Sequence, residues 1–442
     1  MFKVGTYKSA IEPYTRTGQS PEAAEALKAV YTALWDDYRA DVAKARPKAR
    51  IDAITADPIG WLKAAGGDTT LAAQQAGLVD RVGDRVAFGQ RVAEIVGKEP
   101  GGSVGAFRNT KLEPWLADQS LPSAGKPIGV VTIAGEIVDG DAGPGKAGGD
   151  RIAKLLDDAL DDDLAALVVR VDSPGGSVLA SERIRAAIVR HKARGIPIVV
   201  SMGNLAASGG YWVSTPGQTI FAEPATITGS IGIFGIIPTV EATLADWGVN
   251  TDGIRTTPLS GQPDVLGGLT PEVEAMVQGE IEHGYRSFIG LVGKARGKTP
   301  EQVDAIGQGR VWDGGTARQL GLVDRFGDLD DALAFAAAKA GLAKDAWHPV
   351  YLGEGSDLYQ TLLAQMLFSD DDGGSDTGGG LLGMIGARQQ ALSARLSHDL
   401  GMLLGASGMQ AYCLECPVET PRAVAGHGGM LARLAGLFGR KP

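Results

Sequence analysis

Residues 165–177 read Ala-Ala-Leu-Val-Val-Arg-Val-Asp-Ser-Pro-Gly-Gly-Ser, and this stretch decides the fold class. Its apolar first half predicts a buried strand, and the glycine pair predicts a turn before a helix over residues 177–194. Around it, residues 128–133 and 196–201 read as further strands, and residues 150–160 read as an amphipathic helix. Strands that alternate with helices predict an α/β fold with a mostly parallel sheet.

The composition is that of a globular protein with a hydrophobic core. Hydrophobic residues make up 44% of the 442 residues and charged residues 21%. The formal net charge is -10, without a basic stripe, which argues against nucleic acid as the main partner. Uninterrupted apolar stretches stay shorter than the ~18–20 residues that a membrane-spanning helix requires. A signal peptide is not evident at the start, where residues 1–4 instead read as part of a strand.

The sequence contains an internal repeat with an offset near 250 residues. Residues 77–84, GLVDRVGD, match residues 321–328, GLVDRFGD, with one difference. Ser-Pro-Glu at 20–22 matches Thr-Pro-Glu at 270–272, and each predicts a helix start with a hydroxyl N-cap followed by proline. The second of these helices is expected to run from Pro271 to Arg296. We therefore expect two tandem copies of one α/β unit.

The second copy is preceded by a long α/β stretch, and the first copy is not. We therefore expect the chain to begin inside the first repeat; a protein whose first copy was always short is the alternative. The expected domains are residues 1–100 as the C-terminal part of the first repeat, 101–126 as a linker, 127–345 as the second repeat, and 346–442 as a C-terminal extension with a flexible Gly/Asp-rich linker.

The C-terminal extension contains the two cysteines of the chain, Cys413 and Cys416. A zinc site needs about four ligands, and His427 is the only other soft ligand nearby, so a local disulfide or a redox-sensitive pair is favoured over a metal. A pair without function remains an alternative. Apolar-rich helices are expected at 384–404 and 430–438, and the second could pack on a partner subunit or on a membrane surface.

Glycine-rich turns at strand ends supply candidate catalytic groups. Ser208 stands between alanines and glycines after an apolar strand, so its hydroxyl is uncrowded, and the N–H of Gly209 can help to hold an oxyanion. The Gly175-Gly176 pair can point further amides into a cleft. Each turn also has an ordinary reading, as a helix start or a plain turn.

A nucleophilic serine needs a base. None of the five histidines stands at such a turn, and His191 and His283 are expected on solvated helix faces, which disfavours a Ser-His-Asp triad. A lysine can serve if burial lowers its pKa from the reference of about 10.4. By composition and context alone, Lys8 reads as an ordinary surface lysine.

Four blocks resemble the signature blocks of the signal peptide peptidase A (protease IV) family, in its long duplicated type. They occur in order, with family-like spacing, over most of residues 1–350, and they are GTYKSAIEP at 5–13, DSPGGS at 172–177, AASGGYW at 206–212 and TGSIGIFG at 228–235. The CxxC near the end is also similar to the C-terminus of that family.

The resemblance implies an α/β fold of the crotonase/Clp-like ββα spiral type, tandem duplicated, with the first copy incomplete here. It implies Ser208 as the nucleophile, Lys8 as the general base and Ser230 as the hydroxyl that holds the lysine ammonium. Gly175 and Gly209 match the amides of the oxyanion hole.

The resemblance also implies that each repeat supplies one half of the dyad. The counterpart of Lys8 in the second copy is about Thr256, which offers no amine. The lysine and the serine must therefore meet where the two repeats meet, within one chain or between subunits.

The implied function is that of a serine endopeptidase that degrades cleaved signal peptides at the periplasmic side of the bacterial inner membrane. Homo-oligomers, and a membrane anchor missing from this chain, are further implications; no metal, nucleotide or other cofactor is expected. Because such substrates are apolar, the cleft is expected to be lined by small and apolar side chains, with Leu205, Ile231, Ile233 and Phe234 as candidates.

Two alternatives remain open. A crotonase-fold enzyme acting on acyl-CoA would use the oxyanion-type glycine turn and normally carboxylates for proton transfer, which would make Ser208 incidental. A non-catalytic membrane scaffold built on an inactive peptidase would need neither Ser208 nor Lys8.

Overall fold

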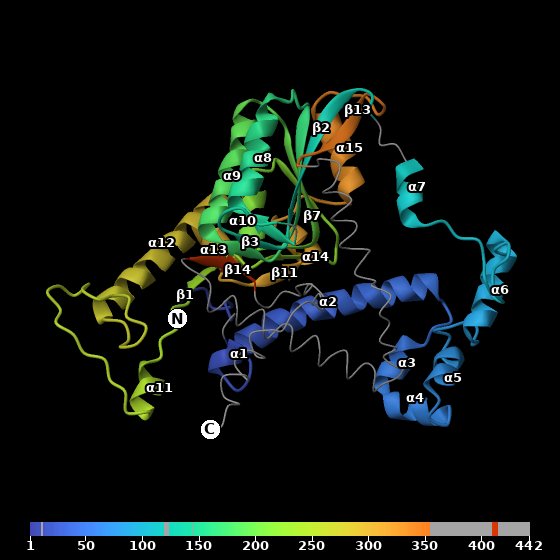
Figure 1. Ribbon diagram of the computed structural model, residues 1–442, viewed down its shortest axis with the longest axis horizontal. Coiled ribbons are helices and arrows are strands. Elements are labelled where there is room, and N and C mark those ends of the chain that lie inside the picture. The colour runs from blue at the N-terminus through green and yellow to red at the C-terminus, as the bar shows by residue number, and fades with distance from the viewer. Residues whose placement is uncertain (10–11, 119–122, 144, 354–408, 414–442) are drawn as a thin grey trace, which may run out of the picture. The chain divides into compact units, whose positions relative to one another are not determined.

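The computed structural model describes residues 1–9, 12–118, 123–143, 145–353 and 409–413 (Figure 1). The helices expected at 384–404 and 430–438, together with Cys416 and His427, lie outside the described residues. Cys413 is disulfide-bonded, which agrees with the disulfide interpretation of the cysteine pair.

A mostly parallel sheet forms the centre of residues 126–351, as predicted. Its strand order is β11 (Val311–Asp313), β9 (Ile227–Gly229), β7 (Ile198–Ala207), β5 (Ala166–Ser173), β2 (Lys126–Ala134) and β13 (Trp347–Tyr351). β8 (Thr219–Ala222) pairs with β7 and with β12 (Arg325–Phe326). All of these pairings are parallel except β11 with β9. β13 lies beyond residue 345, so the sheet includes a strand from the expected C-terminal extension.

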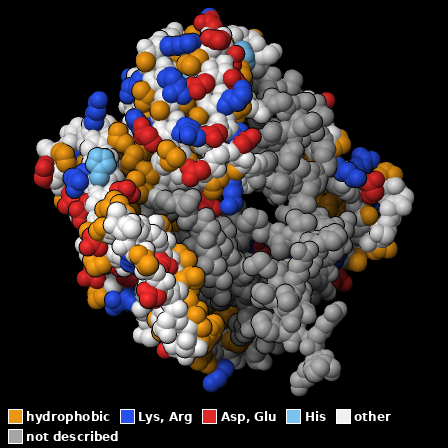
Figure 2. Space-filling model, turned by 60° about the vertical axis from the view of Figure 1, so that its left-hand side comes forward, with side chains coloured by type: hydrophobic (Ala, Val, Ile, Leu, Met, Phe, Trp, Pro, Cys, Tyr) orange, Lys and Arg blue, Asp and Glu red, His pale blue; other side chains and the backbone are white. Residues whose placement is uncertain are grey.

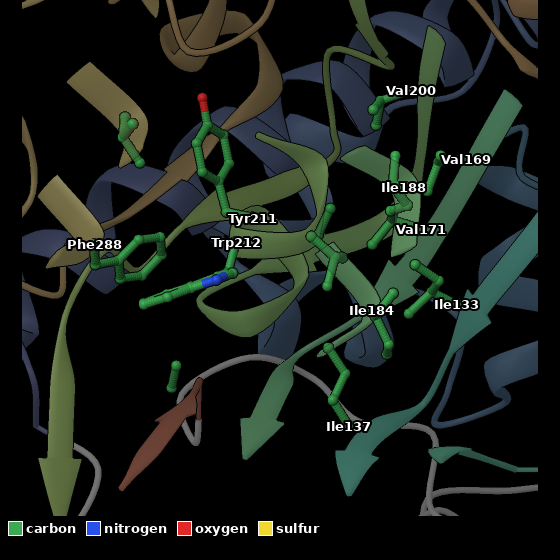
Figure 3. Close-up of a cluster of buried hydrophobic side chains, with 14 of the residues drawn as sticks. Ile133, Ile137, Val169, Val171, Ile184, Ile188, Val200, Tyr211, Trp212 and Phe288 are labelled. Carbon is green, nitrogen blue, oxygen red and sulfur yellow. The ribbon is translucent and has the colours of Figure 1, made fainter. Parts of the chain in front are cut away.

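Helices cover both faces of this sheet (Figure 1). α8 (Gly149–Asp158), α9 (Val178–Ala193) and α10 (Gly209–Ser214) contribute to the core on one face, and α15 (Leu329–Lys339) to the core on the other. Figure 3 shows the first core, in which Val169 and Val171 of β5 lie near Ile184 and Ile188 of α9. Each of these four side chains is fully buried. Burying a branched apolar side chain stabilises a fold by about 1.5–3 kcal/mol.

His191 corrects one sequence-based expectation, because it is fully buried rather than on a solvated helix face. It lies on α9, and its Nε2 is 2.7 Å from the carbonyl oxygen of Leu156 in α8. The apolar pattern of α9 did not reveal that α8 covers this side of the helix. His283, on α12 (Pro271–Arg296), is exposed as expected.

The chain also forms a second, smaller sheet. Its order is β1 (Phe2–Val4), β10 (Ile233–Gly235), β14 (Gln410–Tyr412), β6 (Gly175–Ser177), β3 (Glu136–Val138) and β4 (Lys146–Gly148). β1 pairs antiparallel with β10, which confirms the strand expected at residues 1–4. This sheet joins the start of the chain to β10, which lies far along the sequence.

Two long helices begin at the hydroxyl-proline pairs that the repeated sequence motif predicted. α2 (Pro21–Ala45) has Ser20 as its N-cap, and α12 has Thr270. Val30 of α2 is buried in a cluster with Ala207 and Val311, so α2 packs over the end of the large sheet. The remaining helices are α1 (Glu12–Thr15), α3 (Ile51–Ala56), α4 (Pro58–Ala64), α5 (Thr69–Gln75), α6 (Arg85–Val96), α7 (Leu112–Asp118), α11 (Glu241–Asp246), α13 (Pro300–Ile306), α14 (Gly314–Gln319) and a 3-10 turn, Ala159–Asp161.

The two copies of the repeated motif make the same contacts. In each, an arginine at the end of the long helix donates to a glycine carbonyl and to an aspartate carboxylate of the GLVD segment. The two sets are Arg46 with Gly77 and Asp80, at 3.1 and 2.7 Å, and Arg296 with Gly321 and Asp324, at 2.8 and 2.5 Å.

On the face shown in Figure 2, Lys and Arg side chains are interspersed with Asp and Glu and do not form a basic stripe. Across the described ranges, the helices lack the combination of length and apolarity that crossing a bilayer requires.

Candidate active site

Ser208 lies at the junction between β7 and α10 in a strained backbone conformation. Its φ is 55° and its ψ is -113°, a region that a non-glycine residue rarely adopts. The conformation is held by its N–H, which donates to the carbonyl oxygen of Gly229 at 2.9 Å, and by the helix that starts directly after it. Such strain costs of order 1–3 kcal/mol and is typical of functional positions.

Lys8 reaches Ser208 from the start of the same chain. Its Nζ lies 3.2 Å from Oγ of Ser208 and 2.9 Å from Oγ of Ser230. The lysine side chain is fully buried, as are both serines. A fully buried lysine is unusual, because burial disfavours the charged ammonium. Three of the predicted site residues therefore meet in one buried cluster.

Glycines make the space that Lys8 occupies. A Cβ atom added at Gly309 would lie 2.8 Å from both the backbone nitrogen and Cβ of Lys8, and one at Gly232 would lie 3.3 Å from its Cδ. The preceding segment is fixed by Tyr7, whose N–H donates to the carbonyl oxygen of Gln308 at 2.8 Å. Gln308 and Gly309 are thus positioning residues that the sequence alone did not single out.

Ser230 follows β9 and also has a positive φ, of 51°. Its N–H donates to the carbonyl oxygen of Arg310 at 2.7 Å, which fixes the turn on the segment that precedes β11. Its carbonyl oxygen lies 3.4 Å from Nζ of Lys8, in addition to its hydroxyl. Ser230 therefore offers Lys8 two oxygen partners and no negative charge.

The glycine turn before α9 lies opposite Ser208. A Cβ atom at Gly175 would lie 2.5 Å from the backbone nitrogen of Gly209, so these two predicted site residues are close. The N–H of Gly175 itself donates to Oγ of Ser173 at 3.1 Å. Gly176, the next residue, belongs to the glycine pair that was expected to point amides into a cleft, and the register of β14 on β6 indicates that its amide is a second donor at this place.

The residues expected to line the cleft are buried around this cluster. Ile231 and Ile233 are fully buried, Phe234 is 1% exposed, and its ring centroid lies 5.7 Å from Nζ of Lys8. Leu205 lies in a separate apolar cluster that includes Cys413 and Ala207. The described residues contain no group of three His, Cys, Asp or Glu side chains that could hold a metal ion.

Sequence comparison supplies the family. The profile of peptidase family S49 matches residues 190–343. Protease 4 of Haemophilus influenzae is 36% identical over 426 residues, which are 94% of this chain and 68% of that protein. The chain belongs to peptidase family S49. Protease 4 of Salmonella typhi is 45% identical over 371 residues, which are 83% of this chain.

The S49 chain spans 59% of the length of the Salmonella protein. Among solved structures, a ClpP1 mutant from Listeria monocytogenes is 17% identical, with coverage of 46% of this chain and 94% of that chain. Its TM-score of 0.31 is too low to support an argument about the fold. The mixed α/β class is therefore assigned from the strand order of this chain. Membership of S49 makes this a serine protease homologue and confirms the family recognised from the four sequence blocks.

Proposed function

We propose that this S49 protein is a serine endopeptidase with a Ser–Lys dyad, in which Ser208 is the nucleophile and Lys8 the general base. The observation that carries the proposal is the 3.2 Å approach of Nζ of Lys8 to Oγ of Ser208 in a fully buried site. A general base must lie within hydrogen-bond reach of the proton that it removes.

Acylation begins when Nζ of the neutral Lys8 takes the proton of the Ser208 hydroxyl as Oγ attacks the peptide carbonyl carbon. The tetrahedral intermediate collapses, the C–N bond breaks, and the proton passes from Nζ to the leaving amine. Water then enters and attacks the acyl carbonyl carbon while Nζ takes one of its protons. The C–Oγ bond breaks, and the proton passes from Nζ to Oγ as the acid product leaves. The dyad returns to its starting protonation state after each turnover.

Ser230 holds the base in line. Its hydroxyl is 2.9 Å from Nζ, close enough to accept a hydrogen bond from the amine in either protonation state. A neutral partner fixes the position of Nζ without stabilising the ammonium as a carboxylate would. Ser230 therefore keeps Nζ within reach of the Ser208 hydroxyl, where the proton transfer takes place.

The oxyanion is held by the amide of Gly209 and by the turn that contains Gly175 and Gly176. Gly209 starts α10, so its N–H is free of the helix ladder. Donors that are fixed before the reaction stabilise developing charge without reorganisation. The absence of a side chain at Gly175 allows the turn to lie close to Gly209, because a Cβ there would overlap backbone atoms of Ala411 and Gly209.

The substrates proposed are apolar peptides, specifically cleaved signal peptides at the periplasmic side of the inner membrane. The apolar residues around Lys8, including Ile231 and Phe234, support an apolar cleft. An inner-membrane anchor outside this chain and a homo-oligomeric assembly belong to the same proposal. We also propose a crotonase/Clp-like fold in tandem duplication with the four expected domains, which the matching Arg46 and Arg296 contacts support.

The two alternatives account less well for the site. In an acyl-CoA enzyme Ser208 would be incidental, and a lysine buried against it would have no task. In a scaffold without catalysis, neither the strain at Ser208 nor the cost of burying Lys8 would be offset by function.

Labelling with a fluorophosphonate probe tests the dyad. We expect stoichiometric labelling of Ser208 in the protein, none in Ser208→Ala, and labelling slowed by about 10²–10⁴-fold in Lys8→Ala. Lys63→Ala removes an exposed lysine of the same repeat and should label at the normal rate. Equal labelling of Lys8→Ala and the unmodified protein would exclude Lys8 as the base.

A further inference from the structure

The small sheet contains a strand that is distant in sequence from its neighbours. β14 lies between β10 and β6 and pairs antiparallel with both. Without β14, β10 and β6 would each present a row of unpaired backbone groups to the space beside Ser208. Such a pair of open edges is a site for an extended peptide that adds as a strand.

The register places Ala411 at the reacting position. Cys413 donates to the carbonyl oxygen of Pro174 at 2.8 Å, and Val178 donates to that of Met409 at 3.2 Å. Because hydrogen-bonded pairs alternate in an antiparallel ladder, Ala411 and Gly176 form the hydrogen-bonded pair between them. The carbonyl oxygen of Ala411 is therefore directed at the amide of Gly176.

The same carbonyl oxygen lies beside the amide of Gly209. The Cβ position of Gly175 is 2.0 Å from the oxygen of Ala411 and 2.5 Å from the nitrogen of Gly209. The carbonyl group of Ala411 thus lies where the proposed mechanism needs the carbonyl of a substrate, next to Ser208.

Side chains on both sides of Ala411 anchor this segment. Tyr412 is fully buried, and Cys413 is buried in the apolar cluster with Leu205. Met409 packs on α12, because its sulfur lies 3.1 Å from the Cβ position of Gly284. Residues 409–413 are therefore seated by specific contacts and form a segment that we call the strap.

We propose that the strap is an internal occupant of the substrate groove, which a peptide substrate must displace before it can reach Ser208. The proposal rests on the proposed peptidase function. A segment of the same chain competes at an effective concentration on the order of mM, well above that of a dilute peptide. The strap also indicates a small side chain at the residue before the cut, because Ala411 is fully buried against the turn that contains Gly175.

Peptide binding tests the strap without any catalysis. The probe is a fluorescein-labelled peptide of sequence Gly-Met-Gln-Ala-Tyr-Ser, and its binding is measured by anisotropy on full-length Ser208→Ala protein. Adding Ala411→Pro removes the N–H that pairs with β6 and should tighten probe binding by at least about tenfold, because the groove is vacated. Unchanged or weaker binding by the folded double variant would overturn the proposal.

A second variant and a control guard against a folding defect. Tyr412→Ala removes a buried anchor of the strap, and we expect it to tighten probe binding as Ala411→Pro does. Tyr351→Ala changes a tyrosine of β13, an edge strand of the other sheet, and should leave probe binding unchanged. Tightening by Tyr351→Ala equal to that by Tyr412→Ala would mean general loosening and would count against the strap.

Measurements of activity distinguish failure of the strap proposal from failure of the proposed peptidase function. In protein with Ser208 intact, Ala411→Pro should raise fluorophosphonate labelling and cleavage of an apolar peptide by about tenfold. Tighter probe binding without labelling of any variant would refute the peptidase and keep the strap as an occupant of the groove. If the strap variants that retain Ser208 label at the same rate as the unmodified protein, and if probe affinity is also unchanged, the strap proposal is refuted. The peptidase proposal would then still stand.

Discussion

Nζ of Lys8 lies 3.2 Å from Oγ of Ser208, although 200 residues separate them in the chain. The contact depends on β1, which pairs with β10 and so brings the start of the chain to the segment that carries Ser230. Both partners are completely shielded from solvent. Residues from the start of the chain and from the junction of β7 and α10 thus assemble one site within one chain.

The first prediction concerns the pH dependence of the dyad. The rate of Ser208 acylation should rise with pH as the proton leaves Lys8, because only the neutral amine accepts the serine proton. Lys8→Met keeps an unbranched side chain of similar length, and we expect about a 10²–10⁴-fold slower reaction without this pH dependence. Burst-phase kinetics with an activated ester across a pH series measures both. If Lys8→Met retained the wild-type pH profile, the pH dependence would belong to a group other than Lys8.

The second prediction concerns Ser230. Ser230→Ala removes the 2.9 Å contact to Nζ and should lower kcat by about tenfold or more, with a smaller effect on KM, because the base loses its alignment. Ser230→Thr keeps a hydroxyl and should retain more of the rate. Steady-state kinetics on a fluorogenic apolar peptide compares the three proteins; equal kcat values would remove Ser230 from the positioning of Lys8.

The third prediction uses two glycines with positive φ. Gly309→Ala places a Cβ 2.8 Å from Cβ of Lys8, whereas Gly297→Ala meets nothing within 4 Å. Both substitutions should cost about 1 kcal/mol of stability or more through backbone strain. Only Gly309→Ala should also reduce fluorophosphonate labelling, by about tenfold, because it displaces Lys8. A comparable labelling loss in folded Gly297→Ala would point to strain in general as the cause.

The fourth prediction concerns His191. Burial lowers the pKa of this imidazole below its usual 6.5, and its Nδ1 has no hydrogen-bond partner among the described residues. The unfolded chain therefore binds a proton more readily, so stability is lost as pH falls below 6.5 toward the folded-state pKa.

Urea unfolding at about pH 7.5 and about pH 5.5 measures this loss, and the His191 contribution should be up to about 1 kcal/mol. His191→Gln should be less sensitive to the change in pH. His283→Gln replaces an exposed histidine and should keep the wild-type sensitivity. A His191→Gln protein that loses as much stability as the unmodified chain would contradict the assignment.

The fifth prediction compares the two copies of the repeated arginine contact. The side chain of Arg296 is 7% exposed and that of Arg46 is 34% exposed. Arg296→Ala leaves Asp324 without its partner and should cost about 3 kcal/mol, whereas Arg46→Ala should cost about 1 kcal/mol or less. Denaturant titration of each variant gives the two values. Equal losses would mean that burial does not set the strength of this contact.

The sequence by itself determined the local features of this protein. Apolar runs and glycine turns predicted β2, β5 and β7, and the hydroxyl-proline pairs predicted the starts of α2 and α12. These features depend on neighbours in the chain, so their residue types reveal them. The motif blocks also identified the family and singled out Ser208 and Lys8.

Only the tertiary structure decided what lies next to what. Lys8 reads as a surface residue until β1 pairs with β10, and His191 reads as solvated until α8 covers α9. The roles of Gly309 and of the strap likewise depend on contacts between segments that are far apart in the chain. Burial and long-range pairing are properties of the packed chain, so a residue's chemical type does not disclose whether water reaches it or which distant group it meets.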